Sequence, residues 1–126
     1  EMLAFCRTQG LRVALATSSP RRIIDTILPT LGLATAFEQL HSAEGLPHGK
    51  PHPEIFLRAA AGLGVDPQRC LVLEDSFNGL IAAKAARMQC LVVPANPNDP
   101  RFVIADLCLD SLLAFTQAHW EQLQAR

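Results

Sequence analysis

Residues 70–94 read CLVLEDSFNGLIAAKAARMQCLVVP, and this stretch decides the fold. It contains two short apolar runs, 70–74 and 90–94, with a helical pattern over 76–88 between them. Short apolar runs that are bounded by turn residues are typical of strands buried on both faces, as in a parallel sheet. A strand, a helix and a second strand in this order form a βαβ unit with a right-handed crossover. The stretch therefore predicts two parallel strands joined by a helix.

The same alternation continues on both sides of this unit. Residues 11–17 form another apolar run, followed by Ser19 and Pro20, which suit the N-cap and the first position of a helix. The other expected elements are short strands over 37–41 and 106–109 and helices over 1–9, 20–31, 53–63 and from 111 onward. We therefore expect an α/β fold, a Rossmann-like parallel sheet flanked by helices.

Two of these helices carry patterns that predict their buried side chains. Gly64 ends the helix over 53–63, whose apolar stripe at helical spacing consists of Ile55, Phe56, Ala59 and Leu63. In the helix over 76–88, the expected buried stripe consists of Ile81, Ala85 and Met88.

The composition excludes several classes of protein. The chain has 126 residues and 49% of them are apolar, which is enough for a hydrophobic core and too many for a disordered segment. Its 11 basic residues nearly balance its 12 acidic ones, so there is no basic excess to bind nucleic acid. No apolar run approaches the roughly 18 residues that a membrane span requires. We therefore expect neither a nucleic-acid partner nor a membrane partner.

The cysteines and histidines show neither a disulfide pattern nor a metal-binding pattern. No C-x-x-C pair is present, and we interpret the cysteines as small buried side chains in a reducing cytoplasm: Cys6, Cys70, Cys90 and Cys108. We interpret the histidines as surface or loop residues: His41, His48, His52 and His119. The expected location is cytoplasmic.

Polar residues follow the expected strands, at the sheet edge where α/β proteins bind ligands. Thr17 and Ser18 follow the run over 11–17, and a hydroxyl beside the free N–H groups of a helix N-terminus can bind an anion. The simpler interpretation is a helix cap at Ser19. Lys50 is one of only two lysines, and a compact ammonium group near a strand end suits a phosphate oxygen. The simpler interpretation of Lys50 is a solvated loop lysine.

A third polar cluster, Glu74-Asp75-Ser76, follows the run over 70–74. Two adjacent carboxylates suit a hard cation such as Mg²⁺. The simpler interpretation is that Asp75 or Ser76 caps the next helix. A hydroxyl, a lysine and a carboxylate pair at the ends of separate strands of one parallel sheet together indicate a site for phosphate and Mg²⁺.

These motifs resemble those of the haloacid dehalogenase-like phosphohydrolases, and the likeness covers essentially the whole chain. The family's second motif, an apolar strand that ends in Thr or Ser, matches Thr17. Its third motif, a lysine before a helix, matches Lys50 in KPHPEIF, and its fourth, an acidic pair after an apolar strand, matches Glu74 and Asp75 in LVLEDS. The run EDSFNGLIAAKAARM, with NDPRF after it, resembles the sugar-phosphatase branch, particularly the bacterial hexitol phosphatases.

The resemblance implies a Mg²⁺-dependent phosphatase that hydrolyses small sugar phosphates, such as hexose or hexitol phosphates, through an aspartyl-phosphate. By this resemblance, Thr17 and Lys50 would be catalytic, and Ser18 would bind the substrate phosphate together with them. Asp75 would bind Mg²⁺ directly, and Glu74 would bind it directly or through a water molecule. Ser76 and Asn78 would hold the loop rather than contact substrate.

Members of the family carry the attacking aspartate in a D-x-D motif after the first strand, and a cap domain selects the substrate. No two aspartates of this chain lie two residues apart, and the chain begins at Glu1. We therefore expect residues 1–126 to be a single partial core domain that lacks the first strand and the cap and has no turnover alone. The other functions that we consider are a β-phosphoglucomutase-like phosphotransferase and a non-enzymatic phosphate-binding module.

The resemblance also predicts a gap in the sheet. In the family the first strand lies between the strands that match 11–17 and 70–74, so its absence would leave a slot of about 9–10 Å, two strand spacings. Unpaired backbone edges are costly in a dry interior. We therefore expect a second chain or an exchanged strand to fill the slot, or the two flanking strands to pair directly.

Overall fold

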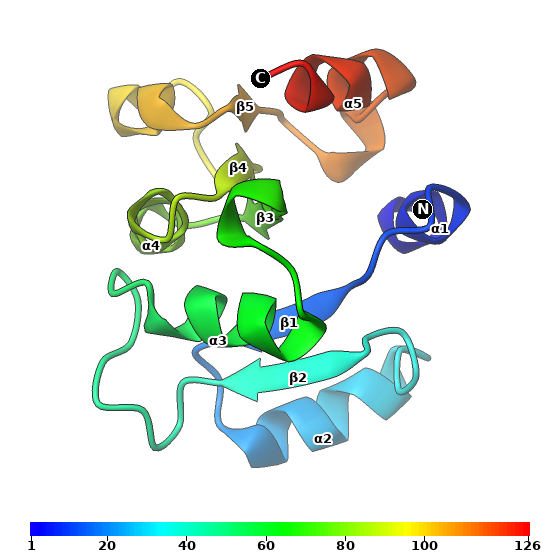
Figure 1. Ribbon diagram of the computed structural model, residues 1–126, viewed down its shortest axis with the longest axis vertical. Helices are drawn as coiled ribbons and strands as arrows, with labels where there is room; N and C mark the ends of the chain where they lie inside the picture. Colours follow the sequence, from blue (N-terminus) through cyan, green and yellow to red (C-terminus); the bar gives the residue numbers. More distant parts are fainter.

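The computed structural model describes residues 1–126 and has the expected alternation of strands and helices (Figure 1). The helices and strands, in chain order, are α1 (Met2–Thr8), β1 (Ala14–Thr17), α2 (Arg21–Thr30), β2 (Gln39–Ser42), α3 (Glu54–Leu63), β3 (Leu71–Glu74), α4 (Phe77–Ala85), β4 (Gln89–Val92), β5 (Leu107–Cys108) and α5 (Gln117–Gln124). Three 3₁₀ turns complete the structure, at Pro67–Arg69, Pro100–Ile104 and Leu112–Ala114. No helix combines the length and the apolar composition that crossing a membrane would require.

All strand pairs are parallel, but the strands form two separate sheets. One sheet has the order β1-β2, with Thr17 opposite Ser42, and the other has the order β3-β4-β5, with Glu74 opposite Val92. The α/β fold with helix-flanked parallel sheets is therefore confirmed. Strands β1 and β3 do not pair. The expectation that these two strands close the slot by direct pairing is wrong.

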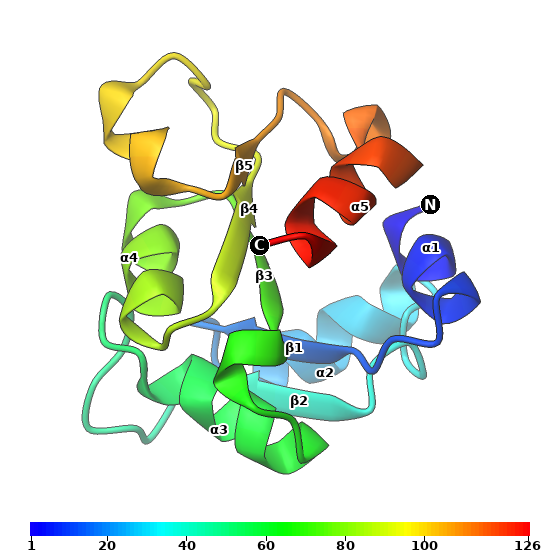
Figure 2. The ribbon, with the colours of Figure 1, turned by 45° about the horizontal axis from the view of Figure 1, so that its top comes forward.

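Helices α3 and α4 join the two sheets on one side (Figures 1 and 2), and the main core lies there. The core cluster combines Ile55 and Phe56 of α3 with Val72 of β3 and Leu80 of α4, and Ala16 of β1 packs against it. On β3, in contrast, the side chain of Leu73 is 39% exposed. Because β-strand side chains alternate between faces, the face opposite α3 and α4 is the less covered one.

The start of α2 and the start of the last helix differ from the expectation. Helix α2 begins at Arg21, with Pro20 rather than Ser19 in the N-cap position, and the carboxylate of Glu44 accepts a hydrogen bond of 2.7 Å from the Arg21 backbone N–H. A carboxylate from a later loop therefore takes the place of the local hydroxyl cap. The last helix begins at Gln117, because the residues just after 111 form a 3₁₀ turn.

The buried face of α4 also differs from the expected one. Ala85 is exposed, Ile81 is half-buried, and the buried residues of the helix are Gly79, Leu80, Ala82 and Ala83. Met88 is buried, as expected, but lies beyond the end of the helix. Because α4 is apolar almost all round, its sequence does not distinguish the covered face from the open one. The stripe expected for α3 is confirmed, since all four of its residues are buried.

Asp106, just before β5, links the second sheet to α4 and to the C-terminal segment. Its carboxylate accepts hydrogen bonds from Lys84 Nζ at 2.8 Å, from the Cys90 backbone N–H at 2.7 Å and from the Arg126 guanidinium at 3.0 Å. Burial by itself would raise the pKa of this carboxyl group, but the hydrogen bonds from Lys84 and Cys90 lower it below its ordinary value. Asp106 therefore joins β4, α4 and the C-terminal segment.

All four cysteines are free, but only Cys90 is fully buried. Burial, aided by the nearby Glu74 and Asp106 carboxylates, raises the pKa of the Cys90 thiol to about 12. Among the histidines, His41 departs from the surface or loop interpretation, because it lies within β2 and its Nε2 is buried without a hydrogen-bond partner. Burial, aided by Arg58 and Arg21, lowers the pKa of His41.

Candidate functional site

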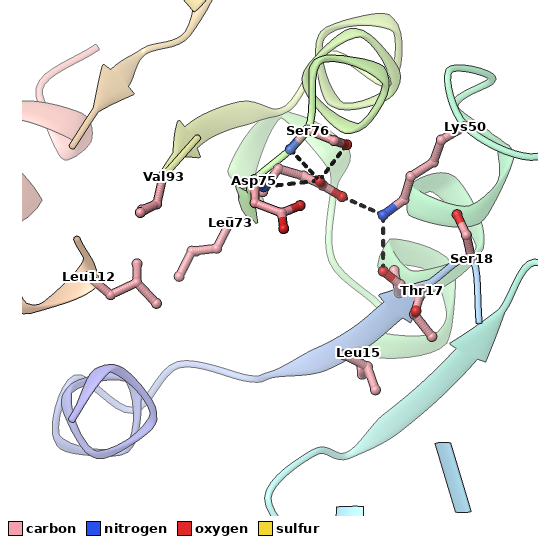
Figure 3. Close-up of a pocket in the computed structure, with 11 residues that line it drawn as sticks. Leu15, Thr17, Ser18, Lys50, Leu73, Asp75, Ser76, Val93 and Leu112 are labelled. Carbon is pink, nitrogen blue, oxygen red and sulfur yellow. Dashed lines mark hydrogen bonds and ion pairs between the residues drawn. The ribbon is translucent and has the colours of Figure 1, made fainter. Parts of the chain in front are cut away.

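A cavity of about 460 Å³ lies between the carboxyl ends of β1 and β3, one strand from each sheet (Figure 3). Three of its apolar residues, Leu73, Val93 and Leu112, lie together at the end of the cavity away from Lys50, whereas Leu15 lies near Thr17 (Figure 3). Its polar residues are Thr17, Ser18, Lys50, Glu74, Asp75 and Ser76, and its apolar residues are Leu15, Ala16, Leu73, Val93 and Leu112. The structure therefore brings every site residue that the sequence indicated to the wall of one cavity. Sequence reasoning missed the apolar wall.

Lys50 reaches this cavity from the loop between β2 and α3. Its ammonium group forms an ion pair with Glu74 and donates a hydrogen bond of 3.3 Å to the Ala16 carbonyl oxygen. The ammonium also lies 4.9 Å from the centre of the Phe56 ring. The side chains of Lys50 and Glu74 are only 11% and 7% exposed. The interpretation of Lys50 as a solvated loop lysine is therefore wrong.

Both carboxylate oxygens of Glu74, at the end of β3, have hydrogen-bond partners. Its Oε1 bonds Lys50, and its Oε2 accepts hydrogen bonds from the Asp75 backbone N–H at 3.2 Å and from the Ser76 hydroxyl at 3.1 Å. Ser76 is also the N-cap of α4, because its Oγ accepts a hydrogen bond from the Gly79 N–H at 3.0 Å. Ser76 thus holds the loop, as expected, and Glu74 is fixed between that loop and Lys50.

Gly79 is a residue of this site that sequence reasoning missed. A methyl group added at Gly79 would overlap the carboxylate of Glu74. The sequence does carry a signal for it: glycine is unfavourable in the first turn of a helix, so its presence there indicates that another group approaches closely.

Asp75 differs from Glu74, because its side chain is exposed and makes no hydrogen bond. It lines the same cavity as Lys50 and Thr17 (Figure 3). A free carboxylate fits Mg²⁺, which prefers oxygen ligands, whereas Glu74 fits only through a bridging water unless it gives up its present partners. No group of three or more Asp, Glu, His or Cys side chains lies close enough to hold a metal ion. At this cavity the chain therefore offers one free carboxylate, that of Asp75, and no complete metal site.

Thr17 and Ser18 lie at the opposite wall, at the end of β1. The Thr17 Oγ1 accepts a hydrogen bond of 3.1 Å from the Ser19 N–H, so its own hydroxyl hydrogen remains available. The backbone N–H of Ser18 makes no hydrogen bond. The expected cap at Ser19 is absent, and the two residues that carry these free donors line the cavity.

A second pocket of about 410 Å³ adjoins the first, and the two share Ser18, Lys50 and Ser76. Its other residues are Phe77, Asn78 and Arg101. Asn78 thus lines a pocket, although the sequence suggested only that it holds a loop. Sequence reasoning assigned no role to Arg101, and its only signal was the NDPRF stretch in which it lies.

Comparison with known proteins places this geometry in a family. The family model described as "Hydrolase: haloacid dehalogenase-like hydrolase" matches residues 1–87. Hexitol phosphatase B of Escherichia coli (strain K12) is 52% identical over 118 residues, covering 92% of this chain and 53% of that protein. The chain thus spans about half the length of the curated relatives that it matches. The resemblance of the sequence to bacterial hexitol phosphatases is confirmed.

Solved structures agree with the sequence relatives. The crystal structure of CbbY from Rhodobacter sphaeroides in complex with phosphate has a TM-score of 0.85 and 31% identity, covering 94% of this chain and 55% of that one. The β-phosphoglucomutase from Clostridium difficile has a TM-score of 0.86 and 30% identity, covering 98% of this chain and 54% of that one. The fold, the cavity motifs and the family model agree: the chain belongs to the haloacid dehalogenase-like hydrolase family.

Proposed function

We propose that this chain is part of a Mg²⁺-dependent phosphatase that hydrolyses small sugar phosphates, and that it supplies the phosphate-binding residues and one metal ligand. The observation that carries the proposal is a set of free donors around one cavity. Lys50 has three N–H donors and uses two of them, on Glu74 and the Ala16 carbonyl. The Thr17 hydroxyl and the Ser18 backbone N–H are also free to donate.

Such donors are what phosphoryl transfer requires. Negative charge builds up on the phosphoryl oxygens, and fixed positive groups and N–H donors stabilise it without reorganising. Lys50 would neutralise part of that charge, while Thr17 and Ser18 would orient the phosphoryl group. Bound at Asp75, Mg²⁺ would supply further positive charge, with Glu74 acting through a bound water. The phosphatase name of the Escherichia coli relative supports this assignment.

We further propose that the slot between β1 and β3 receives a strand that carries the attacking aspartate. Two unpaired strand edges face the slot, and the apolar part of its wall, Leu15, Leu73, Val93 and Leu112, suits the side chains of a buried strand. In the family resemblance, an aspartate oxygen on that strand attacks the phosphorus as the ester P–O bond breaks, and water then releases phosphate. Residues 1–126 would then be a partial core domain.

The source of the strand is a separate matter, and three sources are compatible with the slot. It could come from a segment that precedes residue 1, from a second chain or by strand exchange between two copies. Mass determination of the native complex distinguishes a single longer chain from an assembly. The free state of all four cysteines supports a reducing, cytoplasmic location for any of these forms.

The test of this function is phosphate release by the full-length protein. We expect Mg²⁺-dependent release of inorganic phosphate from hexitol and hexose phosphates, a loss of about 100-fold or more with Lys50→Ala, and no turnover by residues 1–126 alone. Lys84→Ala removes the only other lysine of residues 1–126, which lies outside both pockets, and this variant should keep its turnover at temperatures where it is folded. Turnover that survives Lys50→Ala would refute the proposal.

Two other functions give different results in the same assay. The likeness to a β-phosphoglucomutase supports a phosphotransferase, which would move phosphate to a second position of the sugar instead of releasing it. A phosphate-binding module would bind the sugar phosphate without any conversion. Phosphorus NMR of the reaction mixture distinguishes these outcomes.

A further inference from the structure

The second pocket differs chemically from the first. It is lined by two cationic side chains, Lys50 and Arg101, together with two hydroxyls, the Asn78 amide and the Phe77 ring, and no carboxylate lines it. The first pocket is apolar over about half of its lining. A molecule that carries hydroxyl groups and negative charge therefore fits the second pocket and not the apolar end of the first.

Arg101 is held in place at the rim of this pocket, although its side chain is 61% exposed. Its Nε and Nη2 donate to the Asp99 carboxylate at 3.1 and 2.8 Å, and its backbone N–H donates to the same carboxylate at 3.0 Å. The guanidinium carbon lies 5.1 Å from the centre of the Phe77 ring. That ring in turn packs edge-on against the buried Phe102, with the ring centres 6.2 Å apart.

These contacts leave one part of the guanidinium unused. No hydrogen bond involves Nη1 of Arg101. Surface arginines normally lose much side-chain entropy when they bind a ligand. Because Asp99 and Phe77 already restrict Arg101, its Nη1 is a preorganised donor at the pocket rim.

We propose that Arg101 is a specificity-determining residue, which binds the hydroxyl-bearing part of the phosphorylated substrate; this inference rests on the proposed function of the site. The phosphoryl group lies at the residues that the two pockets share, Ser18 and Lys50 among them. The strand proposed above occupies the apolar end of the first pocket. The organic group of the ester therefore extends into the second pocket, where Arg101 and Asn78 donate to its hydroxyl oxygens.

The test compares two kinds of ester with the full-length protein. A hexitol 6-phosphate carries the hydroxyls that Arg101 would bind, and p-nitrophenyl phosphate carries none. With Arg101→Ala we expect kcat/KM for the hexitol phosphate to fall about tenfold to a hundredfold, as for a lost hydrogen bond to a charged group, and kcat/KM for the aryl ester to change less than about threefold. Arg101→Lys should restore only part of the loss, because lysine lacks the planar donor fork.

Arg58→Ala is the matched control, because Arg58 is similarly exposed at 57% and paired with an acidic residue but lines neither pocket. Arg58→Ala should leave kcat/KM unchanged for both esters. An equal loss on both esters with Arg101→Ala, or no loss on either, overturns the assignment of Arg101.

A binding measurement separates this inference from the proposed function. Calorimetric titration of the same variants with hexitol 6-phosphate and with inorganic phosphate, carried out without Mg²⁺ so that the ester is not hydrolysed, needs no turnover. We expect Arg101→Ala to weaken binding of the hexitol phosphate about tenfold and to leave binding of inorganic phosphate unchanged. Absence of turnover by the wild-type protein would refute the phosphatase proposal, whereas equal binding of hexitol phosphate by wild type and Arg101→Ala would refute the role of Arg101.

Discussion

Lys50→Met leaves the carboxylate of Glu74 buried without its cation. Both side chains are largely buried, at 11% and 7% exposure, so water cannot replace the lost partner freely. Removing one member of a buried ion pair typically costs about 3–5 kcal/mol of the free energy of unfolding. Glu74 keeps two backbone N–H donors and the Ser76 hydroxyl, which offset part of that cost. We therefore expect Lys50→Met to cost about 2–3 kcal/mol.

Glu74→Gln provides the second arm of a double-mutant cycle. In the double variant no charged carboxylate is left without a cation. Its destabilisation should therefore be smaller than the sum for the two single variants, with a coupling energy of about 1–2 kcal/mol. Urea unfolding at neutral pH measures the free energy of unfolding of the wild type, the two single variants and the double variant. With a slope of roughly 1–3 kcal/mol per molar urea, Lys50→Met should lower the midpoint by about 0.7–3 M.

The exposed pair Arg58–Glu54 is the matched control for this cycle. Its nitrogen and oxygen lie 2.9 Å apart on one face of α3, and the arginine is 57% exposed. Exposed pairs of this kind contribute about 0.3–0.5 kcal/mol. A coupling energy for Lys50 and Glu74 that is no larger than the value for this control pair would refute the reasoning.

Three further changes test other parts of the structure. Gly79→Ala should destabilise the protein by about 1–2 kcal/mol despite the better helix propensity of alanine, since its methyl group would displace the Glu74 carboxylate; thermal unfolding measures this, and a rise in Tm would contradict it. Asp106 has a lowered pKa in the folded state, so its stabilisation is present above its unfolded pKa, about 3.9, and is lost as the pH falls through the folded value. Urea unfolding between pH 2 and 6 should therefore show a weaker loss of stability at acid pH for Asp106→Asn than for wild type, and parallel profiles would exclude this role. Cys90, with a thiol pKa of about 12, should resist iodoacetamide at pH 8 until the protein unfolds, and peptide mass spectrometry that finds rapid alkylation of the native protein would contradict its burial.

The pattern of the sequence predicts most elements of the fold, because each leaves a local signal. The apolar runs around Leu15, Val72 and Leu91 identified parallel strands, although only the last of these strands is largely buried. The buried stripe of α3 was predicted correctly because polar residues of that helix mark the side that the stripe does not occupy. The stripe of α4 was wrong because alanines lie on several sides of that helix, and its buried face is selected by packing against β4, β3 and α3.

The candidate site was predictable for a different reason. Thr17, Lys50 and Asp75 follow separate strands, and parallel topology alone brings strand ends to one edge. Contacts between residues far apart in the sequence were not predictable. The cap that Glu44 supplies to α2 and the position of Arg101 over Phe77 join residues far apart in sequence, with no pattern that links them. Such contacts depend on the folded backbone and leave no trace in local spacing.

The central claim is that the cavity between β1 and β3 binds a phosphoryl group and Mg²⁺. A crystal structure of the full-length protein with Mg²⁺ and tungstate, a phosphate mimic, tests this claim most directly. We expect an oxyanion within hydrogen-bond distance of Lys50 Nζ and the Thr17 hydroxyl, a Mg²⁺ ion about 2.0–2.1 Å from an Asp75 carboxylate oxygen, and a strand paired with both β1 and β3. An oxyanion bound elsewhere, with Lys50 and Asp75 free of ligands, would contradict it.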